Sequence, residues 1–317
     1  MPVLILALNP SIDAEWRVDD VLWEGKNNVH SERRWAGGKG INVARWLKQL
    51  GGKPQLLLPL GGPTGVALDG YLRAEKLPAN IIRLREPTRV NVILTTKGGR
   101  QMRFNPLGPK LSPREWLGIV SGVKRELARL PEEQGRAHRP MRGVVRRSMI
   151  SPPGLLILSG SLPRGVPVTA YAQLIRLARR CGVNTLLDCD GPVFAAAIKA
   201  RPALVKPNEH ELAQWWGKPL RAKADIIRAA RALSGVTRGW VLVSRGRRHS
   251  VLVNVVERYQ GFAAPRNVKP RNSVGAGDAL LAGVAREMQL GRAPAEWLRR
   301  GVEIGTAATQ LPPGKMP

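Results

Sequence analysis

The sequence predicts an α/β fold in which a doubly wound, mostly parallel sheet carries helices on both faces. Short apolar runs alternate with amphipathic stretches along most of the chain, and the apolar side chains of those stretches recur three and four residues apart. Parallel strands need long crossover connections, and helices in these connections cover the sheet. Ligands bind such sheets beyond the carboxyl ends of the strands, so we expect the chemistry in the loops that follow the strands.

The expected strands and helices follow from these patterns. Short continuous apolar runs predict buried strands at Val3–Leu8, Gln55–Leu60, Leu155–Leu158, Thr185–Leu187, Ala203–Val205 and Trp240–Val243. Apolar residues at helical spacing predict helices at Ile41–Leu50, Val168–Arg180, Ala224–Leu233 and Leu280–Leu290.

Three segments lack this alternation. Residues 13–35 and 87–105 contain short alternating stretches without crossover helices, which predicts antiparallel ribbons that form a small β-lid over the main sheet. Residues 131–153 are rich in Pro, Gly and Arg and show no periodicity, which predicts a mobile, basic surface insertion. We therefore expect residues 1–317 to form a single domain that carries a lid and this insertion.

The composition indicates a protein of the reducing cytoplasm. Of the 317 residues, 43% are hydrophobic, which is enough for a large core. The two cysteines, Cys181 and Cys189, provide neither a disulfide framework nor a metal cluster. Acidic residues on both sides of Cys189 raise the pKa of a thiol, so we expect it to be buried and structural. The apolar run Val3–Leu8 is too short for a signal sequence, and no segment has the pattern of a membrane span.

The formal net charge of +28 predicts attraction to polyanions, among them nucleotides, sugar phosphates, nucleic acid and acidic membrane surfaces. The basic residues are spread along the chain, as pairs such as Arg33-Arg34 and Arg179-Arg180, and aromatic residues make up only 5%. Nucleic-acid-binding proteins more often have a dense basic stripe with aromatic residues for stacking. The pattern favours an arginine-rich, solvated surface, although it does not exclude nucleic acid as a partner.

The sharpest motif is a glycine-rich turn that runs into the last predicted helix. Its small residues, Gly275, Ala276 and Gly277, allow backbone N–H groups to approach an anion, and the start of the helix adds partial positive charge. The next residue, Asp278, is unsuited to anion binding. It is suited to take a proton from a hydroxyl while the amides stabilise a transferring phosphoryl group. The alternative is an acidic first-turn residue that is favoured by the helix dipole.

Three further loops follow predicted strands or begin predicted helices. In the segment Trp35–Ala44, Asn42 would lie in the first helical turn, where its amide can hold a sugar hydroxyl. After another strand, Asn208 and Glu211 share one face of a helix and suit Mg²⁺ bound through water, although the same spacing predicts a capping box. The remaining loop is Ser159–Pro163.

Together and in this order, these motifs resemble the ribokinase-like (PfkB) carbohydrate kinases, and in particular the branch of 1-phosphofructokinases and tagatose-6-phosphate kinases. The resemblance covers nearly the whole chain. It is carried by Leu8–Asp13, GGKGINVAR (37–45), Thr88–Val92, SGSLPRGVP (159–167), LVKPNEHEL (204–212) and SVGAGDALLAG (273–283). It implies one α/β domain with a β-lid, in agreement with the fold predicted from the hydrophobic patterns.

The resemblance implies a role for each motif in phosphoryl transfer. Asp278 would be the catalytic base, with the N–H groups of residues 275–277 as the anion hole. Arg89 would grip the phosphate that the substrate already carries, a task suited to a bidentate guanidinium. The other substrate-binding positions would be Asp13, Gly38, Lys39, Asn42, Asn91 and Ser159.

The resemblance also implies ATP and Mg²⁺ as cofactors. Asn208 and Glu211 would act on Mg²⁺ through water and on the ATP phosphates. The nucleotide side would further include Lys206, Ser244 and Gly246. The lid would close on the substrate and exclude water, which otherwise competes as the phosphoryl acceptor. Relatives often pair through their lids, so the resemblance implies a homodimer.

The expected reaction converts fructose 1-phosphate to fructose 1,6-bisphosphate, with tagatose 6-phosphate and fructose 6-phosphate as alternative substrates. Two departures from the family pattern bear on it. The loop Ser244–His249 carries arginines that could clamp the ATP phosphates or obstruct the adenine, and Asn105–Gly108 lacks the carboxylate usual in this branch. A degenerate kinase fold that acts as a basic nucleic-acid-binding protein is the alternative from a different class.

Overall fold

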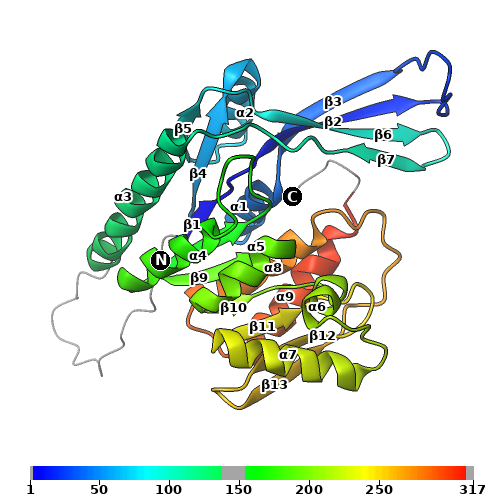
Figure 1. Ribbon diagram of the computed structural model, residues 1–317. Coiled ribbons are helices and arrows are strands. Elements are labelled where there is room, and N and C mark those ends of the chain that lie inside the picture. The colour runs from blue at the N-terminus through cyan, green and yellow to red at the C-terminus, as the bar shows by residue number, and fades with distance from the viewer. Residues whose placement is uncertain (1–2, 138–153, 312–317) are drawn as a thin grey trace.

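The main body of the protein is a mostly parallel sheet enclosed by helices (Figure 1). The structure is a computed structural model that describes residues 3–137 and 154–311. Within those residues, the sheet has nine strands in the order β13-β12-β11-β10-β9-β8-β1-β4-β5. They are β1 (Val3–Leu6), β4 (Pro54–Gly61), β5 (Ala79–Leu84), β8 (Leu155–Ser159), β9 (Asn184–Asp188), β10 (Leu204–Val205), β11 (Trp240–Val243), β12 (Ser250–Asn254) and β13 (Tyr259–Ala263).

This sheet confirms the predicted fold class. The strands from β5 to β11 in the spatial order all pair in parallel, and β12 and β13 add an antiparallel edge. All the predicted strands are present, although the first one ends at Leu6 rather than at Leu8. The prediction omits β5, β12 and β13. Because β5 and β13 are edge strands with mostly half-buried residues, they lack the continuous apolar run that marks a central strand.

Helices cover both faces of the sheet, and each face has its own hydrophobic core. One face carries α1 (Lys39–Gln49), α2 (Gly62–Ala74), α8 (Ala276–Gln289) and α9 (Pro294–Ala308). The other carries α3 (Pro113–Ala137), α4 (Ala170–Arg180), α5 (Gly191–Ala197), α6 (Glu209–Trp216) and α7 (Lys223–Thr237). Side chains alternate along a strand, so Leu4 and Leu6 of β1 enter one core while Val3 and Ile5 enter the other. None of the described helices is long and apolar enough to cross a membrane.

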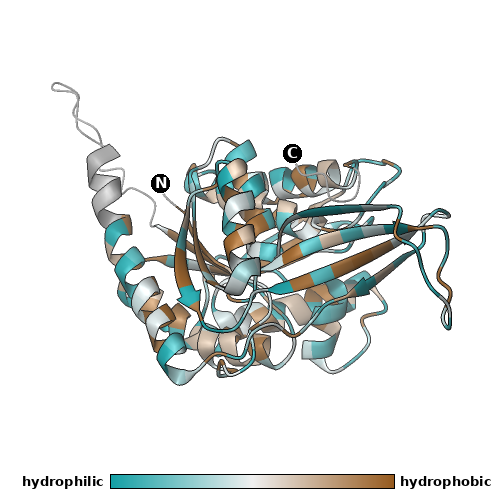
Figure 2. Ribbon diagram, turned by 90° about the horizontal axis from the view of Figure 1, so that it is seen from above, coloured by the Kyte–Doolittle hydropathy of each residue, from teal (hydrophilic) through white to brown (hydrophobic). Residues whose placement is uncertain are grey.

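A second sheet, which we call the lid, projects from the main body (Figure 1). Its strands are β2 (Ser11–Val18), β3 (Ser31–Gly37), β6 (Arg89–Thr96) and β7 (Gln101–Phe104), in the order β3-β2-β6-β7. The two segments predicted to form ribbons supply all four strands. The pairs β2–β3 and β6–β7 are antiparallel, as expected, whereas β2 and β6 pair in parallel. Figure 2 shows hydrophobic and hydrophilic residues mixed along the lid strands.

The segment 131–153 differs from its prediction in its first part. Helix α3 extends to Ala137, so the expectation of an aperiodic insertion is wrong for residues 131–137. Most of these residues are strong helix formers, which outweigh the single proline at the start of the segment. Residues 138–153 lie outside the described part of the chain.

Helices α8 and α9 approach each other closely through glycine, which yields a test of the packing. A Cβ atom at Gly283 would lie 2.9 Å from the Cα atom of Gly301 and 3.2 Å from the carbonyl oxygen of Arg300. Because backbone atoms cannot move aside, we expect Gly283→Ala to lower the free energy of unfolding by about 1–3 kcal/mol in urea denaturation.

The matched control is Gly235→Ala, on the exposed side of α7, where a Cβ atom would meet open space. This substitution is expected to raise the free energy of unfolding by roughly 0.5–1 kcal/mol, because alanine is the better helix former. Equal changes at the two positions would contradict the close approach of α8 and α9.

Candidate active site

The carboxyl ends of the central strands and the lid surround one large pocket of about 1020 Å³. Its walls come from the ends of β8 and β9, from the loops after β10 and β11, from the starts of α1 and α8, and from the lid and α9. Every site residue predicted from the sequence lines this pocket, namely Asp13, Gly38, Lys39, Asn42, Arg89, Asn91, Ser159, Lys206, Asn208, Glu211, Ser244, Gly246, Gly275, Ala276, Gly277 and Asp278.

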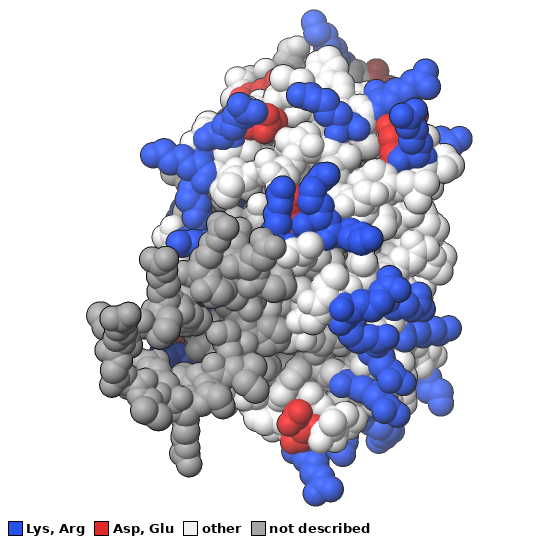
Figure 3. Space-filling model, turned by 90° about the vertical axis from the view of Figure 1, so that its left-hand side faces the viewer, with Lys and Arg blue, Asp and Glu red and all other residues white. Residues whose placement is uncertain are grey.

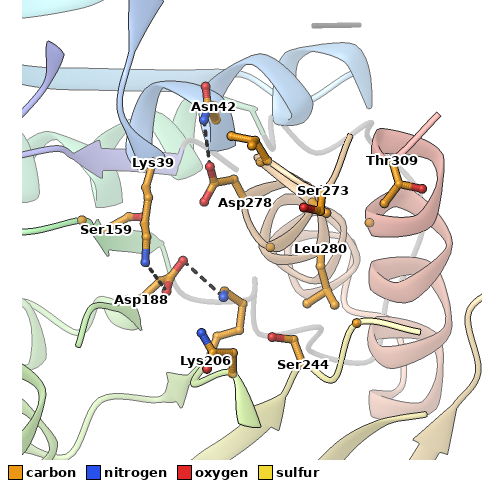
Figure 4. Close-up of a pocket in the computed structure, with 18 of the residues that line it drawn as sticks. Lys39, Asn42, Ser159, Asp188, Lys206, Ser244, Ser273, Asp278, Leu280 and Thr309 are labelled. Carbon is orange, nitrogen blue, oxygen red and sulfur yellow. Dashed lines mark hydrogen bonds and ion pairs between the residues drawn. The ribbon is translucent and has the colours of Figure 1, made fainter. Parts of the chain in front are cut away.

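Asp278 lies in the first turn of α8. The preceding Gly275 has a φ of 78°, a left-handed conformation that suits glycine. Asp278 is buried, and Asn42 Nδ2 donates a hydrogen bond of 2.8 Å to its Oδ2 (Figure 4). Burial and the negative charge of Asp188 raise the pKa of Asp278 to about 7, against the Asn42 hydrogen bond and two nearby lysines. A carboxyl group with this pKa can accept a proton at neutral pH.

Asp188, at the end of β9, bridges two lysines beside Asp278 (Figure 4). Its Oδ1 lies 3.4 Å from Lys39 Nζ, and its Oδ2 lies 3.3 Å from Lys206 Nζ. Burial favours the neutral acid, but the charges of the two lysines prevail and lower the pKa of Asp188. The sequence prediction did not include Asp188. Its signal was its place at the carboxyl end of a buried strand, which it shares with Ser159 on the neighbouring β8.

The turn predicted to bind an anion is flanked by one of these lysines. A Cβ atom on Gly277 would lie 3.3 Å from Lys206 Nζ, so the ammonium group lies directly against the start of α8. The first N–H groups of a helix have no partners within the helix and carry partial positive charge. The ammonium group and these N–H groups together suit a phosphoryl group.

The lid contributes a buried carboxylate, Asp13 on β2. Ser11 Oγ and Asn91 Nδ2 each donate a hydrogen bond of 2.8 Å to Asp13 Oδ1. Burial nevertheless raises the pKa of Asp13. On the neighbouring β3, a side chain at Gly37 would collide with the Asp13 carboxyl group, so the absence of a Cβ atom makes room for it. This end of the pocket therefore offers acceptors that suit hydroxyl groups.

Several polar atoms at the same end are buried without a hydrogen-bond partner among the described residues. They include Asn9 Oδ1, Arg89 Nε and Asn91 Oδ1, and Ser159 Oγ at the end of β8 is another. The Arg89 guanidinium is held by main chain, because its terminal nitrogens donate to the carbonyl oxygens of Asn9 and Pro106 at 2.9 Å each. Buried polar groups without partners are costly. Their concentration here fits a polar ligand that would satisfy them.

Asn208 and Glu211 form a capping box at the start of α6. Asn208 Oδ1 accepts a hydrogen bond from the Glu211 N–H, and Glu211 Oε2 accepts one from the Asn208 N–H, both at 2.8 Å. The capping interpretation is thus correct, and both residues also line the pocket. In the described residues, no three His, Cys, Asp or Glu side chains are grouped to hold a metal.

The arginines of the loop after β11 are divided between two locations. Arg245 and Arg248 each lie 3.0 Å from Glu209 Oε2 on α6, which holds the loop against that helix. Arg245 and Arg247 line the pocket together with Ser244 and Gly246, whereas Arg248 does not.

The part of the pocket between α8 and α9 was not predicted from the sequence. It is lined by Leu280, Val302, Gly305, Thr306 and Thr309. Four of these residues, from Val302 to Thr309, follow one another at intervals of three, one and three residues, which places them on one face of α9 and its end. This spacing is the sequence signal that could have identified this part of the pocket. Figure 4 shows Leu280 and Thr309 on neighbouring helices, on the far side of Asp278 from Asn42.

Known proteins resemble the chain over nearly its full length. The model of the pfkB family of carbohydrate kinases matches residues 8–120 and 137–313. The chain belongs to this family. The ATP-dependent 6-phosphofructokinase isozyme 2 of Escherichia coli is 31% identical over 311 residues, which cover 97% of this chain and 92% of that protein. The 1-phosphofructokinase of Rhodobacter capsulatus is 30% identical over 316 residues, 98% of this chain and 93% of that protein.

Solved structures support the same family. Phosphofructokinase-2 from Escherichia coli in complex with substrates and products has a TM-score of 0.85 at 28% identity, and the match covers 98% of this chain and 94% of that one. Ribokinase from Arabidopsis thaliana, with a TM-score of 0.71 at 19% identity, shares the fold. The family resemblance inferred from the motifs is confirmed. This pfkB chain is a sugar kinase, and its family implies the use of ATP.

The interaction between Asp188 and Asp278 yields a prediction for the pfkB kinase that can be tested without an activity assay. Asp188→Asn is expected to shift the titration of Asp278 from about pH 7 to lower pH, because it removes a negative charge that raises the Asp278 pKa. Carbon-13 NMR of protein labelled at the aspartate carboxyl carbons measures this midpoint, and Asp278→Asn assigns the signal. An unchanged midpoint would show that the two carboxylates do not interact.

Proposed function

We propose that this pfkB kinase transfers the γ-phosphoryl group of ATP to fructose 1-phosphate and forms fructose 1,6-bisphosphate. The observation that carries the proposal is Asp278, buried at the start of α8 and bonded to Asn42, between the lid end and the α8–α9 end of the pocket. With a pKa of about 7, a substantial fraction of this group is ionised at neutral pH and can act as a base.

In the proposed reaction, Asp278 takes the proton of the sugar C6 hydroxyl as the hydroxyl oxygen attacks the γ-phosphorus. The new P–O bond forms while the bond to the leaving oxygen of ADP breaks, and the proton stays on Asp278. The N–H groups of residues 275–277 and the ammonium groups of Lys39 and Lys206 would stabilise the charge on the transferring group.

The sugar phosphate would lie under the lid. Asp13 and Asn91 offer hydrogen-bond acceptors to its hydroxyl groups, and Gly38 leaves room where α1 begins. Arg89 would bind the phosphate that the substrate already carries, since its buried Nε has no partner among the described residues. Closure of the lid over this end would exclude water.

ATP would occupy the remaining part of the pocket, with its base between α8 and α9 and its phosphates near Ser244, Gly246 and Lys206. Asn208 and Glu211 would hold Mg²⁺ through water. The ion, when bound, neutralises phosphate charge.

The choice of sugar phosphate is based on the names of similar proteins. Proteins from Rhodobacter capsulatus, Bacillus subtilis and Xanthomonas campestris, at 28–32% identity, are named 1-phosphofructokinase, which supports fructose 1-phosphate. The 6-phosphofructokinase of Escherichia coli supports fructose 6-phosphate, and a Bacillus licheniformis protein, 27% identical, is named D-tagatose-1-phosphate kinase. Tagatose phosphates are therefore further alternatives.

We also propose that residues 1–317 act as one cytoplasmic domain that carries the lid, and that two copies pair through their lids. A solved form of phosphofructokinase-2 from Escherichia coli is described as tetrameric, so association is known in a similar protein.

Asp278→Asn tests the proposed base. We expect kcat to fall by about 10²–10⁴, because the amide cannot accept the proton. The wild-type kcat/KM is expected to decrease as the pH falls below about 7, where Asp278 becomes protonated.

A surface change of the same kind, Asp69→Asn on α2, is the control and is expected to leave kcat unchanged. Urea denaturation shows whether both variants fold. Undiminished turnover in folded Asp278→Asn protein would remove this residue from the mechanism.

A coupled assay with ATP, Mg²⁺ and the 1- and 6-phosphates of fructose and tagatose tests the substrate. We expect the highest kcat/KM with fructose 1-phosphate. Arg89→Gln is expected to raise KM for every phosphorylated sugar, because each loses the same charged contact. A higher kcat/KM with another phosphate would replace the proposed substrate, and transfer to none of them would support the degenerate binding protein instead.

A further inference from the structure

In the described residues, every non-glycine residue with a positive φ is basic. These residues are Lys76, Arg201, Arg238 and Arg258, with φ between 51° and 61°. A left-handed backbone costs an ordinary L-residue roughly 1 kcal/mol, whereas glycine adopts it freely. The chain does use glycine at comparable turns, as at Gly182. The four cations therefore occupy positions that the backbone alone would assign to glycine.

All four lie at one edge of the main sheet, the amino edge, where the parallel strands begin. Arg201 precedes β10, Arg238 precedes β11 and Lys76 precedes β5. Arg258 lies in the turn between β12 and β13, and this turn reaches the same edge because β12 runs antiparallel to β11. The active-site pocket opens at the opposite edge, where these strands end.

Two more exposed cations continue the series, Arg180 before β9 and Lys53 before β4. We call the six residues, in the spatial order of their strands, the amino-edge row: Arg258, Arg238, Arg201, Arg180, Lys53 and Lys76. Adjacent strands pair in register, with Leu204 opposite both Leu186 and Trp240, so the segments that enter them lie side by side. From β12 to β5 there are seven steps between strands, which span roughly 34 Å.

The charge of the amino-edge row is not neutralised by described carboxylates. All six side chains are exposed, and none forms an ion pair within the described part of the chain. Neither 164–187 nor 191–208 nor 226–256 contains an Asp or Glu residue. Of the acidic residues near the row, Glu75 is bound by Arg45 and Glu296 pairs with Arg299, while Glu257 and Glu287 remain.

Further cations flank the row, among them Arg179 and Lys199, which lie close together because Arg179 donates to the carbonyl oxygen of Ala200. Figure 3 shows the side of the molecule that lies to the left in Figure 1, where β1 begins. Lys and Arg side chains gather on this side, with few acidic ones between them.

Helix dipoles do not account for this row by themselves. Four of the six, namely Lys76, Arg180, Arg201 and Arg238, lie at or just after the carboxyl end of a helix and complement its dipole. Arg258, however, lies in a turn between two strands, and Lys53 follows the end of α1 by several residues. The effect of a dipole falls off within the last helical turn. The feature that all six positions share is the edge of the sheet.

We propose that the amino-edge row binds the phosphate backbone of a nucleic-acid duplex. Its span matches about one helical turn of a duplex, which presents phosphates at regular intervals over that length. The row contains no exposed aromatic side chain for stacking on single-stranded bases, so its contacts are with phosphates. Because the pocket opens at the other edge, a bound duplex leaves the active site accessible.

Two variants of equal net charge test the proposal. One, R180Q/R201Q/R238Q/R258Q, removes four cations of the amino-edge row. The control, K97Q/K110Q/R114Q/K218Q, removes four exposed cations without ion pairs among the described residues. They lie in the lid, in the loop before α3, at the start of α3 and in the loop after α6. The probe is a fluorescent DNA duplex of about three helical turns, titrated without ATP or sugar at several salt concentrations.

The loss of four phosphate contacts is expected to reduce the slope of log affinity against log salt by about 3.6 in the row variant. Between roughly 50 and 200 mM salt, the affinity of the row variant for the duplex is therefore expected to fall about 100-fold less than that of the wild type. The control variant is expected to keep nearly the wild-type slope. Thermal unfolding and kinase turnover, where turnover is found, verify that both variants fold.

An equal reduction of the salt slope in the two variants would overturn the proposal, because duplex binding would then depend on net charge alone. So would undetectable binding by the wild type, or binding to phosphatidylglycerol vesicles without binding to the duplex. None of these outcomes depends on the identity of the sugar or on Asp278, so the proposed kinase activity stands or falls separately.

Discussion

The bridge from Asp188 to Lys39 and Lys206 is the interaction on which the rest of the site depends. The positive charges of the two lysines lower the pKa of Asp278, and Asp188 draws both ammonium groups to itself. Asp188 shares the lysines and adds a negative charge of its own. Burial of Asp278 raises its pKa further, so its ionisation is balanced near neutral pH.

This balance is a product of the sheet. Lys39 comes from α1, Asp188 from the end of β9, Lys206 from the residue after β10 and Asp278 from α8. Parallel strands in register end at the same edge, so side chains remote in sequence become neighbours there. Glycine completes the arrangement where a Cβ atom would intrude, at Gly277 beside Lys206.

The two edges of the sheet divide the positive charge between two environments. At the carboxyl edge, the cations are partly buried and paired with Asp188, or line the pocket. At the amino edge, the six cations of the amino-edge row are exposed, free of ion pairs within the described residues and partly placed on strained backbone. A site for two phosphorylated substrates accounts for the first group. It leaves the second unexplained, and that group contributes to a net charge of +28.

The sequence by itself determined the fold class, the family and part of the pocket lining, because hydrophobic periodicity and glycine-rich turns are local signals. It did not determine the edge strands β5 and β13, whose residues are only half-buried, or the extension of α3 through residues 131–137. Only the tertiary structure decided that Asp188 joins two lysines, that α9 closes the pocket, and that scattered cations form a row. These depend on which strands lie side by side, and pairing between distant segments leaves no trace in local sequence.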